Sequence, residues 1–272
     1  MSILHAIVLG ITQGLSEFLP ISSSGHLRLV PWLFGWDDFA GDAGLEKTFD
    51  VALHLGTLVG AVAYFRADIV RYLRAAFTAA GEGTDDRRVA WLLVISTVPA
   101  AVTGALFADV IEERTGYIWL IAAMLIVFGL VLGRADRRPG VRPVEDVRLR
   151  DALLMGAGQA VALQPGVSRS GVTMTAGRLA GLGRDGTARF AFLMSLPITA
   201  GALVFKGIDV AGEGGIPDGF AAPFAWGIVA SGLTGWLAVW GTLKLIRTRS
   251  FAPFVTYRVV VGVGVLVLYT LR

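Results

Sequence analysis

Apolar residues fall in long blocks along this chain, and short polar segments separate the blocks. A helix needs roughly 20 predominantly apolar residues to cross the hydrocarbon core of a bilayer. Six blocks are close enough to that length and apolar enough to do so: 49–65, 89–108, 117–133, 187–206, 220–243 and 253–271. The pattern therefore predicts six transmembrane helices.

Two further apolar stretches, 3–19 and 152–164, are shorter or carry polar residues. Each continues into a loop rich in proline, serine and glycine, and a short helical segment follows, at 27–36 and at 172–182. Helix, irregular loop and short helix together are typical of a re-entrant hairpin. Non-helical backbone is tolerated at membrane depth only where protein buries it or where it lines a wet cavity.

The two halves of the chain repeat one motif and one order of elements, a hairpin followed by three spans. Gln13 precedes the run Pro20-x-Ser22-x-Ser24-Gly25, and Gln159 precedes Pro165-x-x-Ser168-x-Ser170-Gly171. Since three is odd, the second hairpin enters from the opposite face of the membrane. This predicts an inverted repeat whose loops meet near the midplane.

Composition agrees with a membrane protein. Hydrophobic residues make up 54% of the chain and charged residues 17%, with a mean hydropathy of +0.66, whereas a soluble domain carries about 25% charged residues. The absence of cysteine excludes disulfide and thiolate chemistry. We expect an all-α integral membrane protein in one membrane domain, built from two inverted repeats (1–150 and 151–272), with six transmembrane helices and two re-entrant helical hairpins.

Basic and acidic loops alternate along the chain. The basic loops are 66–88, 134–150 and 244–250, and the acidic ones carry Asp37, Asp38 and Asp42, then Asp109, Glu112 and Glu113, then Asp209, Glu213 and Asp218. The positive-inside rule places the basic loops in the cytoplasm. Both termini and the opening of the first hairpin then face the exterior. The net charge of +3 reflects these loops, and no nucleic-acid partner is expected.

Gln13 and Glu17 are four residues apart, so they share one face of the first hairpin helix. An ionisable group inside a membrane segment is usually functional. Glu17 could hold magnesium or calcium against a pyrophosphate, or act as a general acid or base; the alternative is a carboxylate that reaches interfacial water. Gly10 and Gly14 lie on a neighbouring stripe, where another helix could approach closely.

The first loop offers hydroxyl donors, a flexible backbone and an imidazole: Ser22, Ser23, Ser24, Gly25 and His26. One interpretation is a nucleophilic serine beside a histidine. Another is a histidine that protonates the leaving phosphate. The structural alternative is a turn whose hydroxyls cap the following helix.

The second loop places one guanidinium between two serines, in the run Ser168, Arg169, Ser170 and Gly171. Arg169 opens a helix whose amides point into the loop, which suits bidentate phosphate binding. The alternative is a counter-ion for Glu17 from the other hairpin, and the two roles are compatible.

Three more residues have candidate roles. His54 lies within the first span, where a lone histidine typically bonds a neighbouring helix; lining the site is its alternative role. Arg189 and Arg258 lie near span ends, where we expect them to snorkel or to form ion pairs.

Both motifs resemble those of the undecaprenyl pyrophosphate phosphatase family of the bacitracin-resistance type. The resemblance rests on Gln13-x-x-x-Glu17-Phe18-Leu19-Pro20-x-Ser22-Ser23-x-Gly25-His26 and on Pro165-Gly166-x-Ser168-Arg169-Ser170-Gly171-x-Thr173. The order of the motifs, the length and the number of spans agree as well. Position 13 is Gln where many members have Glu, and Ser24 stands where Thr is frequent.

The resemblance implies hydrolysis of undecaprenyl pyrophosphate to undecaprenyl phosphate and inorganic phosphate, which recycles the carrier lipid for cell-wall synthesis and confers bacitracin resistance. It implies a divalent cation, magnesium or calcium, with Glu17 and Gln13 as ligands. By position, Glu17, Ser23 and His26 resemble the catalytic residues, with either the serine or the histidine attacking, and Arg169 the phosphate-binding arginine. Ser22, Ser24, Gly25, Ser168, Ser170 and Gly171 are the further candidate phosphate-binding residues, and His54 and Thr173 the candidates for lining the site.

The implied location is the bacterial plasma membrane, with the active site facing the exterior and a polyprenyl pyrophosphate lipid as the partner. A homodimer is left open. The rival function is a carrier or flippase for polyprenyl phosphate, because inverted repeats and broken helices are also transporter architecture. A carrier releases its ligand unchanged and needs no nucleophile beside a histidine.

Overall fold

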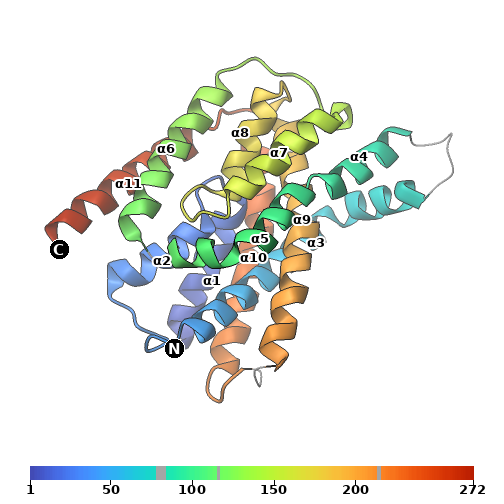
Figure 1. Ribbon diagram of the computed structural model, residues 1–272. Helices are drawn as coiled ribbons and strands as arrows, with labels where there is room; N and C mark the ends of the chain where they lie inside the picture. Colours follow the sequence, from blue (N-terminus) through green and yellow to red (C-terminus); the bar gives the residue numbers. More distant parts are fainter. Residues whose placement is uncertain (78–83, 115–116, 213–215) are drawn as a thin grey trace.

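The computed structural model describes residues 1–77, 84–114, 117–212 and 216–272, and this part of the chain is almost wholly helical (Figure 1). Its elements are α1 (Ile3–Phe18), α2 (Ser23–Phe34), α3 (Ala43–Phe77), α4 (Thr84–Ile95), α5 (Val98–Arg114), α6 (Ile118–Asp136), the 3-10 turn η1 (Val144–Asp146), α7 (Leu149–Val161), α8 (Arg169–Leu179), α9 (Arg184–Gly212), α10 (Ala221–Ile246) and α11 (Ala252–Leu271). Of the acidic residues expected in outer loops, Glu213 and the side chains of Asp109, Glu112, Glu113 and Asp209 lie outside the described residues.

Six helical segments of the described chain are long and apolar enough to cross a membrane, which confirms the expected all-α class and number of spans. They are α3, α4 with α5, α6, α9, α10 and α11. The span expected at 89–108 is broken between α4 and α5. Pro99 is the reason, because it has no N–H to donate to the carbonyl of Ile95, where α4 ends, and its ring would clash with that carbonyl.

Glycines allow α1 and α3 to pack closely against α10. A Cβ atom at Gly10 would lie 2.5 Å from the carbonyl oxygen of Gly227, and one at Gly14 would lie 2.6 Å from that of Ser231. On α3, Gly60 meets α10 in the same way. The close helix approach predicted at Gly10 and Gly14 is therefore confirmed, and it places α1 directly against α10.

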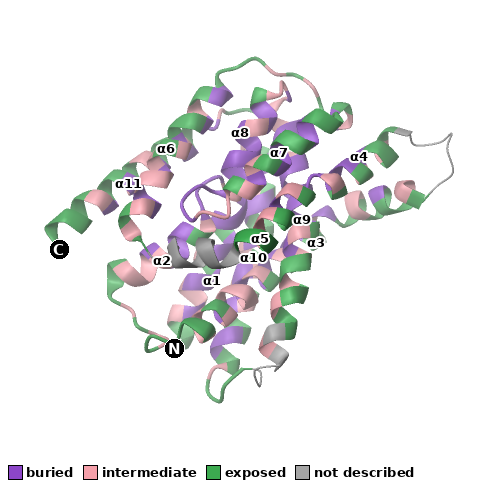
Figure 2. Ribbon diagram, viewed as in Figure 1, coloured by how far each residue is buried: buried purple, intermediate pink, exposed green. Residues whose placement is uncertain are grey.

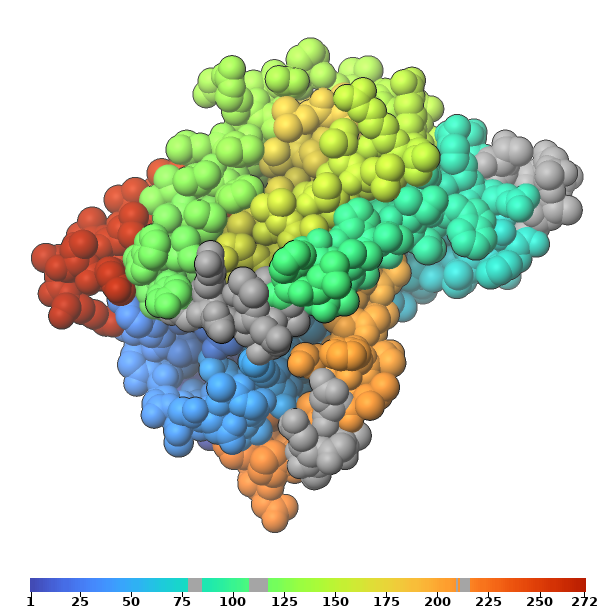
Figure 3. Space-filling model, in the orientation of Figure 1, coloured from blue at the N-terminus to red at the C-terminus, as the bar shows by residue number. Residues whose placement is uncertain are grey.

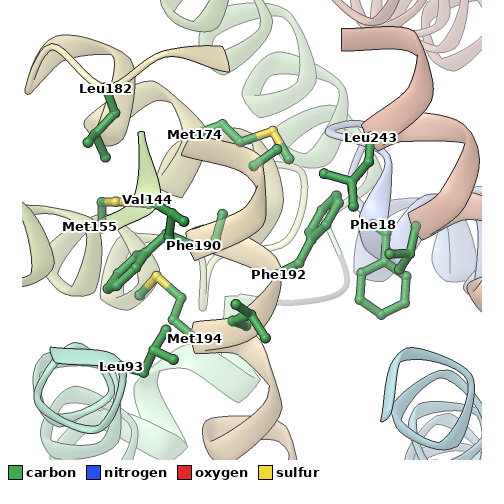
Figure 4. Close-up of a cluster of buried hydrophobic side chains, with 14 of the residues drawn as sticks. Phe18, Leu93, Val144, Met155, Met174, Leu182, Phe190, Phe192, Met194 and Leu243 are labelled. Carbon is green, nitrogen blue, oxygen red and sulfur yellow. The ribbon is translucent and has the colours of Figure 1, made fainter. Parts of the chain in front are cut away.

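The largest buried apolar cluster surrounds α9 (Figure 4). Phe18, the last residue of α1, packs edge-on against Phe192 of α9, with ring centroids 5.5 Å apart. Burial is concentrated on α8 and the loop that precedes it, whereas α11 is largely exposed along its length (Figure 2). Exposed valines of α11, such as Val260 and Val267, suit a surface that faces lipid. The core thus anchors the end of α1 that carries Glu17.

Candidate functional site

The two helix–loop–helix units have the same backbone conformation at their turns. Ser22 (φ 79°, ψ 96°) precedes α2 and Ser168 (φ 74°, ψ 112°) precedes α8. Each hydroxyl accepts a hydrogen bond from the amide three residues on, at Gly25 (3.4 Å) and at Gly171 (3.1 Å). Positive φ is costly for a serine and persists only where the surroundings impose it.

These caps correct the predicted starts of the two short helices. We expected them to begin at residues 27 and 172, but they begin at Ser23 and Arg169. The capping role that we considered for the first loop is confirmed for Ser22, because its side chain satisfies an amide of the first turn. The hydroxyls of Ser22 and Ser168 are therefore engaged within the loops, and phosphate contact by them stays a prediction.

The two loops contact each other directly. The Ser22 hydroxyl accepts a hydrogen bond from the Gly166 amide (3.1 Å), and the Ser170 hydroxyl donates one to the Leu19 carbonyl (3.1 Å). These partners lie 144 and 151 residues apart in the sequence. The expected meeting of the loops is confirmed, whereas the inverted relation of the repeats stays a prediction.

Arg258 of α11 holds both loops in place. Its side chain is fully buried, and the guanidinium donates to the carbonyl oxygens of Pro20 (3.2 Å), Gly166 (2.9 Å) and Val167 (3.0 Å). The same side chain bonds the carbonyl of Leu125 on α6 through Nε (3.0 Å). Turn carbonyls need donors when buried, and arginine offers five of them in one rigid group.

Our expectation that Arg258 would snorkel or form an ion pair is therefore wrong, whereas the one for Arg189 is confirmed by its contact with Asp68 (2.7 Å). In the sequence, Arg258 stands out only as an arginine among the apolar residues of a span, which does not indicate that it bonds the loops. Its partners are carbonyls, which every residue carries, so no motif identifies them.

The Glu17 carboxylate is the centre of the site. Its Oε2 atom accepts hydrogen bonds from the Ser23 hydroxyl (2.5 Å) and the Gln13 amide (3.2 Å), and its Oε1 atom forms an ion pair with Arg169. The counter-ion alternative for Arg169 is thus confirmed. Thr199 of α9, which the sequence did not indicate, accepts a hydrogen bond from the other terminal nitrogen of Arg169 (2.8 Å).

Both ring nitrogens of His26 are bonded to groups other than Ser23. Its Nδ1 atom is 2.7 Å from the Ser22 carbonyl oxygen and therefore carries the hydrogen, because a carbonyl only accepts. Its Nε2 atom is 2.8 Å from the Tyr257 hydroxyl, and the two rings stack. The base within hydrogen-bond reach of Ser23 is Glu17, and a catalytic role for His26 stays a prediction.

A cavity of about 770 Å³ joins both loops to α3, α5 and α9. Its polar lining consists of Glu17, Ser22, Ser23, Ser24, His54, Thr97, Gln159, Ser168, Arg169, Thr199 and Lys206. His54 does line the site, with Nε2 3.7 Å from Glu17 Oε2. Of the other predicted residues, Gln13, Gly25, His26, Ser170, Gly171 and Thr173 are not part of this lining. Thr173 bonds the Arg169 carbonyl within α8 (2.8 Å).

The donor set for a divalent cation is small. No group of three or more His, Cys, Asp or Glu side chains that could hold a metal occurs among the described residues. However, the Oε1 atom of Gln13 is buried without a hydrogen-bond partner there. A carboxylate and amide oxygens are hard ligands, and magnesium commonly binds one or two carboxylates together with substrate phosphates. Glu17 and Gln13 therefore offer one carboxylate and one amide oxygen to a cation, and of the two only Glu17 lines the cavity.

Fold and site together define a polytopic helical membrane protein whose arginine- and hydroxyl-lined pocket lies between two contacting loops and the neighbouring helices. The profile of the family described as bacitracin resistance protein BacA matches residues 6–264, and the chain belongs to this family.

Curated relatives cover the whole length. The chain is 47% identical over 273 residues to the undecaprenyl-diphosphatase of Pelotomaculum thermopropionicum (100% of this chain, 98% of the relative). It is 48% identical over 270 residues to that of Geobacter sulfurreducens (98% of each). It is 44% identical over 275 residues to that of a Nocardioides species (97% and 96%). The family resemblance seen in the two motifs is confirmed.

Proposed function

We propose that this protein hydrolyses undecaprenyl pyrophosphate to undecaprenyl phosphate and inorganic phosphate, and so recycles the carrier lipid for cell-wall synthesis. The observation that carries the proposal is the hydrogen bond from the Ser23 hydroxyl to Glu17, at 2.5 Å, beside the phosphate-binding candidate Arg169. The names of the relatives support the same activity. A carrier or flippase needs no hydroxyl held against a carboxylate.

In the proposed mechanism Ser23 is the nucleophile and Glu17 the general base. Glu17 takes the proton of the Ser23 hydroxyl, and the oxygen attacks the terminal phosphorus. The bond from that phosphorus to the bridging oxygen breaks, and the lipid monophosphate leaves. Arg169 stabilises the charge on the transferred group. Water then hydrolyses the phosphoserine and releases inorganic phosphate.

The apolar side of the cavity suits the prenyl chain. It is lined by small, exposed residues of α5 and α9, including Ala101, Ala105, Gly201 and Ala202. In Figure 3, α5 lies across the face of the molecule that is turned toward the viewer. Ligand cavities of a few hundred Å³ hold drug-sized molecules, so the cavity takes the pyrophosphate and the first isoprene units. The rest of the chain lies in the bilayer.

A magnesium or calcium ion belongs to the proposal. Glu17 and Gln13 would hold it from the protein side. When bound, such a cation neutralises charge on the pyrophosphate oxygens and makes the phosphorus more electrophilic.

The proposed location is the bacterial plasma membrane, with the pocket open to the exterior. The chain is free of cysteine, so single cysteines report topology. Cysteines at 37–42 should react with an impermeant thiol reagent in intact cells. Those at 138–148 should react only after permeabilisation, and the opposite pattern would reverse the orientation.

The activity is tested by phosphate release from undecaprenyl pyrophosphate by purified protein in detergent with magnesium. Ser23→Ala should leave only a small residual rate, whereas Ser195→Ala, which removes a buried hydroxyl bonded to the Phe192 carbonyl, should keep activity. A slowed variant should accumulate acid-stable phosphoserine. Acid-labile phosphohistidine would assign the attack to His26, and the absence of both would favour direct attack by water. If the wild-type protein releases no phosphate, the hydrolase proposal fails, and the same pocket would then belong to a carrier or flippase.

A further inference from the structure

Gln159 has a buried side chain that nothing in the described part of the chain satisfies. It lies in the last turns of α7, is 3% exposed and lines the cavity. Both its Nε2 and its Oε1 atoms lack a hydrogen-bond partner among the described residues. Most buried polar atoms in proteins have a hydrogen-bond partner, because an amide without one loses its hydration without compensation. The orphaned amide thus indicates a partner that comes from outside the chain.

The repeated motif explains why the amide has no partner on its own helix. In the first unit, Gln13 is followed four residues later by Glu17, which accepts its amide hydrogen at 3.2 Å. In the second unit, the residue four positions after Gln159 is Leu163, which offers no acceptor. The two glutamines hold corresponding places, but within the described part of the chain only the Gln13 side chain forms a hydrogen bond.

We infer that Gln159 is a substrate-contacting residue that donates its amide to an oxygen of the pyrophosphate group. The chemistry matches, because phosphate oxygens only accept hydrogen bonds and the amide nitrogen carries two donors. The Oε1 atom accepts a hydrogen bond from water that hydrates the same group. Gln159 would then bind the anion from α7, in addition to Arg169 from α8. The inference rests on the proposed placement of the pyrophosphate in this cavity.

The test uses Gln159→Met, which keeps the length of the side chain and removes both polar atoms. Binding of inorganic pyrophosphate with magnesium is measured by calorimetry, and thermal unfolding is measured without ligand. We expect binding to weaken about 10- to 100-fold, the loss typical of one hydrogen bond to a charged group. We expect the unfolding midpoint without ligand to stay equal or to rise, because an unsatisfied buried amide is gone.

The matched control is Thr242→Val. The Thr242 hydroxyl on α10 is also buried without a partner among the described residues, and it does not line the cavity. Its removal should raise the unfolding midpoint and leave pyrophosphate binding unchanged. A second variant, Gln159→Glu, keeps the polar shape and adds a negative charge, and it should weaken binding at least as much as Gln159→Met.

Wild-type affinity in both Gln159 variants would overturn the inference. A lowered midpoint of Gln159→Met with unchanged affinity would do the same, because it would make Gln159 a structural residue. Should Gln159→Met fail to fold, the affinity of Gln159→Glu decides alone. Failure of the proposed function looks different, since wild type would then bind pyrophosphate in a Gln159-dependent manner without releasing phosphate from the lipid.

Discussion

Replacing Arg258 with methionine should damage both stability and activity, although Arg258 does not line the pocket. Its guanidinium reaches the carbonyls of Pro20, Gly166 and Val167, which belong to the two loops. Methionine fills much of the same volume but donates no hydrogen bond. The two loops would lose a side chain that bonds both of them and also bonds α6.

The magnitude follows from these contacts. Each buried carbonyl left without a donor costs about 1–3 kcal/mol, and three loop carbonyls depend on Arg258. Removing a buried charge returns part of that loss, because the charge no longer has to be desolvated. We expect a net loss of about 3–5 kcal/mol, which lies in the lower half of the sum for three carbonyls. This is a large part of the 5–15 kcal/mol that typically stabilises a folded protein.

The assay compares thermal unfolding in detergent and phosphate release for Arg258→Met, Arg258→Lys and Arg247→Met. Arg258→Lys keeps the charge but has three donors and no fork, so it should be intermediate. Arg247 is largely exposed and pairs with Asp185 on the surface (63% and 45% exposed side chains), so its loss should cost at most about 1 kcal/mol. If Arg258→Met unfolds and turns over like Arg247→Met, the loops do not depend on Arg258 and the reasoning is refuted.

Three further changes test other parts of the site and fold. Arg169→Lys keeps the charge and loses the bidentate fork, so turnover should fall by about 10- to 100-fold at normal expression; near-wild-type rates would rule out bidentate phosphate binding. Glu17→Gln should abolish both phosphate release and its response to added magnesium or calcium, and a retained metal response would place the cation elsewhere. Gly14→Ala puts a Cβ 2.6 Å from the Ser231 carbonyl and should lower stability by about 1–3 kcal/mol, measured by thermal unfolding, while Gly241→Ala, with open space around it, should be neutral.

The amino-acid sequence determined the helical class, the number of spans and the candidate reacting groups. Lipid leaves no alternative for backbone polar groups but internal hydrogen bonds, so long apolar blocks have to be helices, and their length reports the spans. The two Pro/Ser/Gly loops are exceptions to this rule. Glu17, Ser23 and Arg169 could be selected from the sequence because they lie in or beside these loops. What local patterns could not supply was the start of α2 and α8, because Ser22 and Ser168 adopt a positive φ that only their surroundings impose.

Tertiary structure alone decided which of these groups meet. The ion pair of Glu17 with Arg169 spans 152 residues, and the bond of His26 to Tyr257 spans 231. Both depend on how α1, α2, α8 and α11 pack, and side-chain spacing within a helix carries no information on that packing. Arg258 and Gln159 differ from ordinary span residues only through their buried surroundings, where one donates to carbonyls of distant loops and the other has no partner in the described chain. A polar group needs a hydrogen-bond partner once it is buried, and burial is a property of the assembled helices rather than of any one segment.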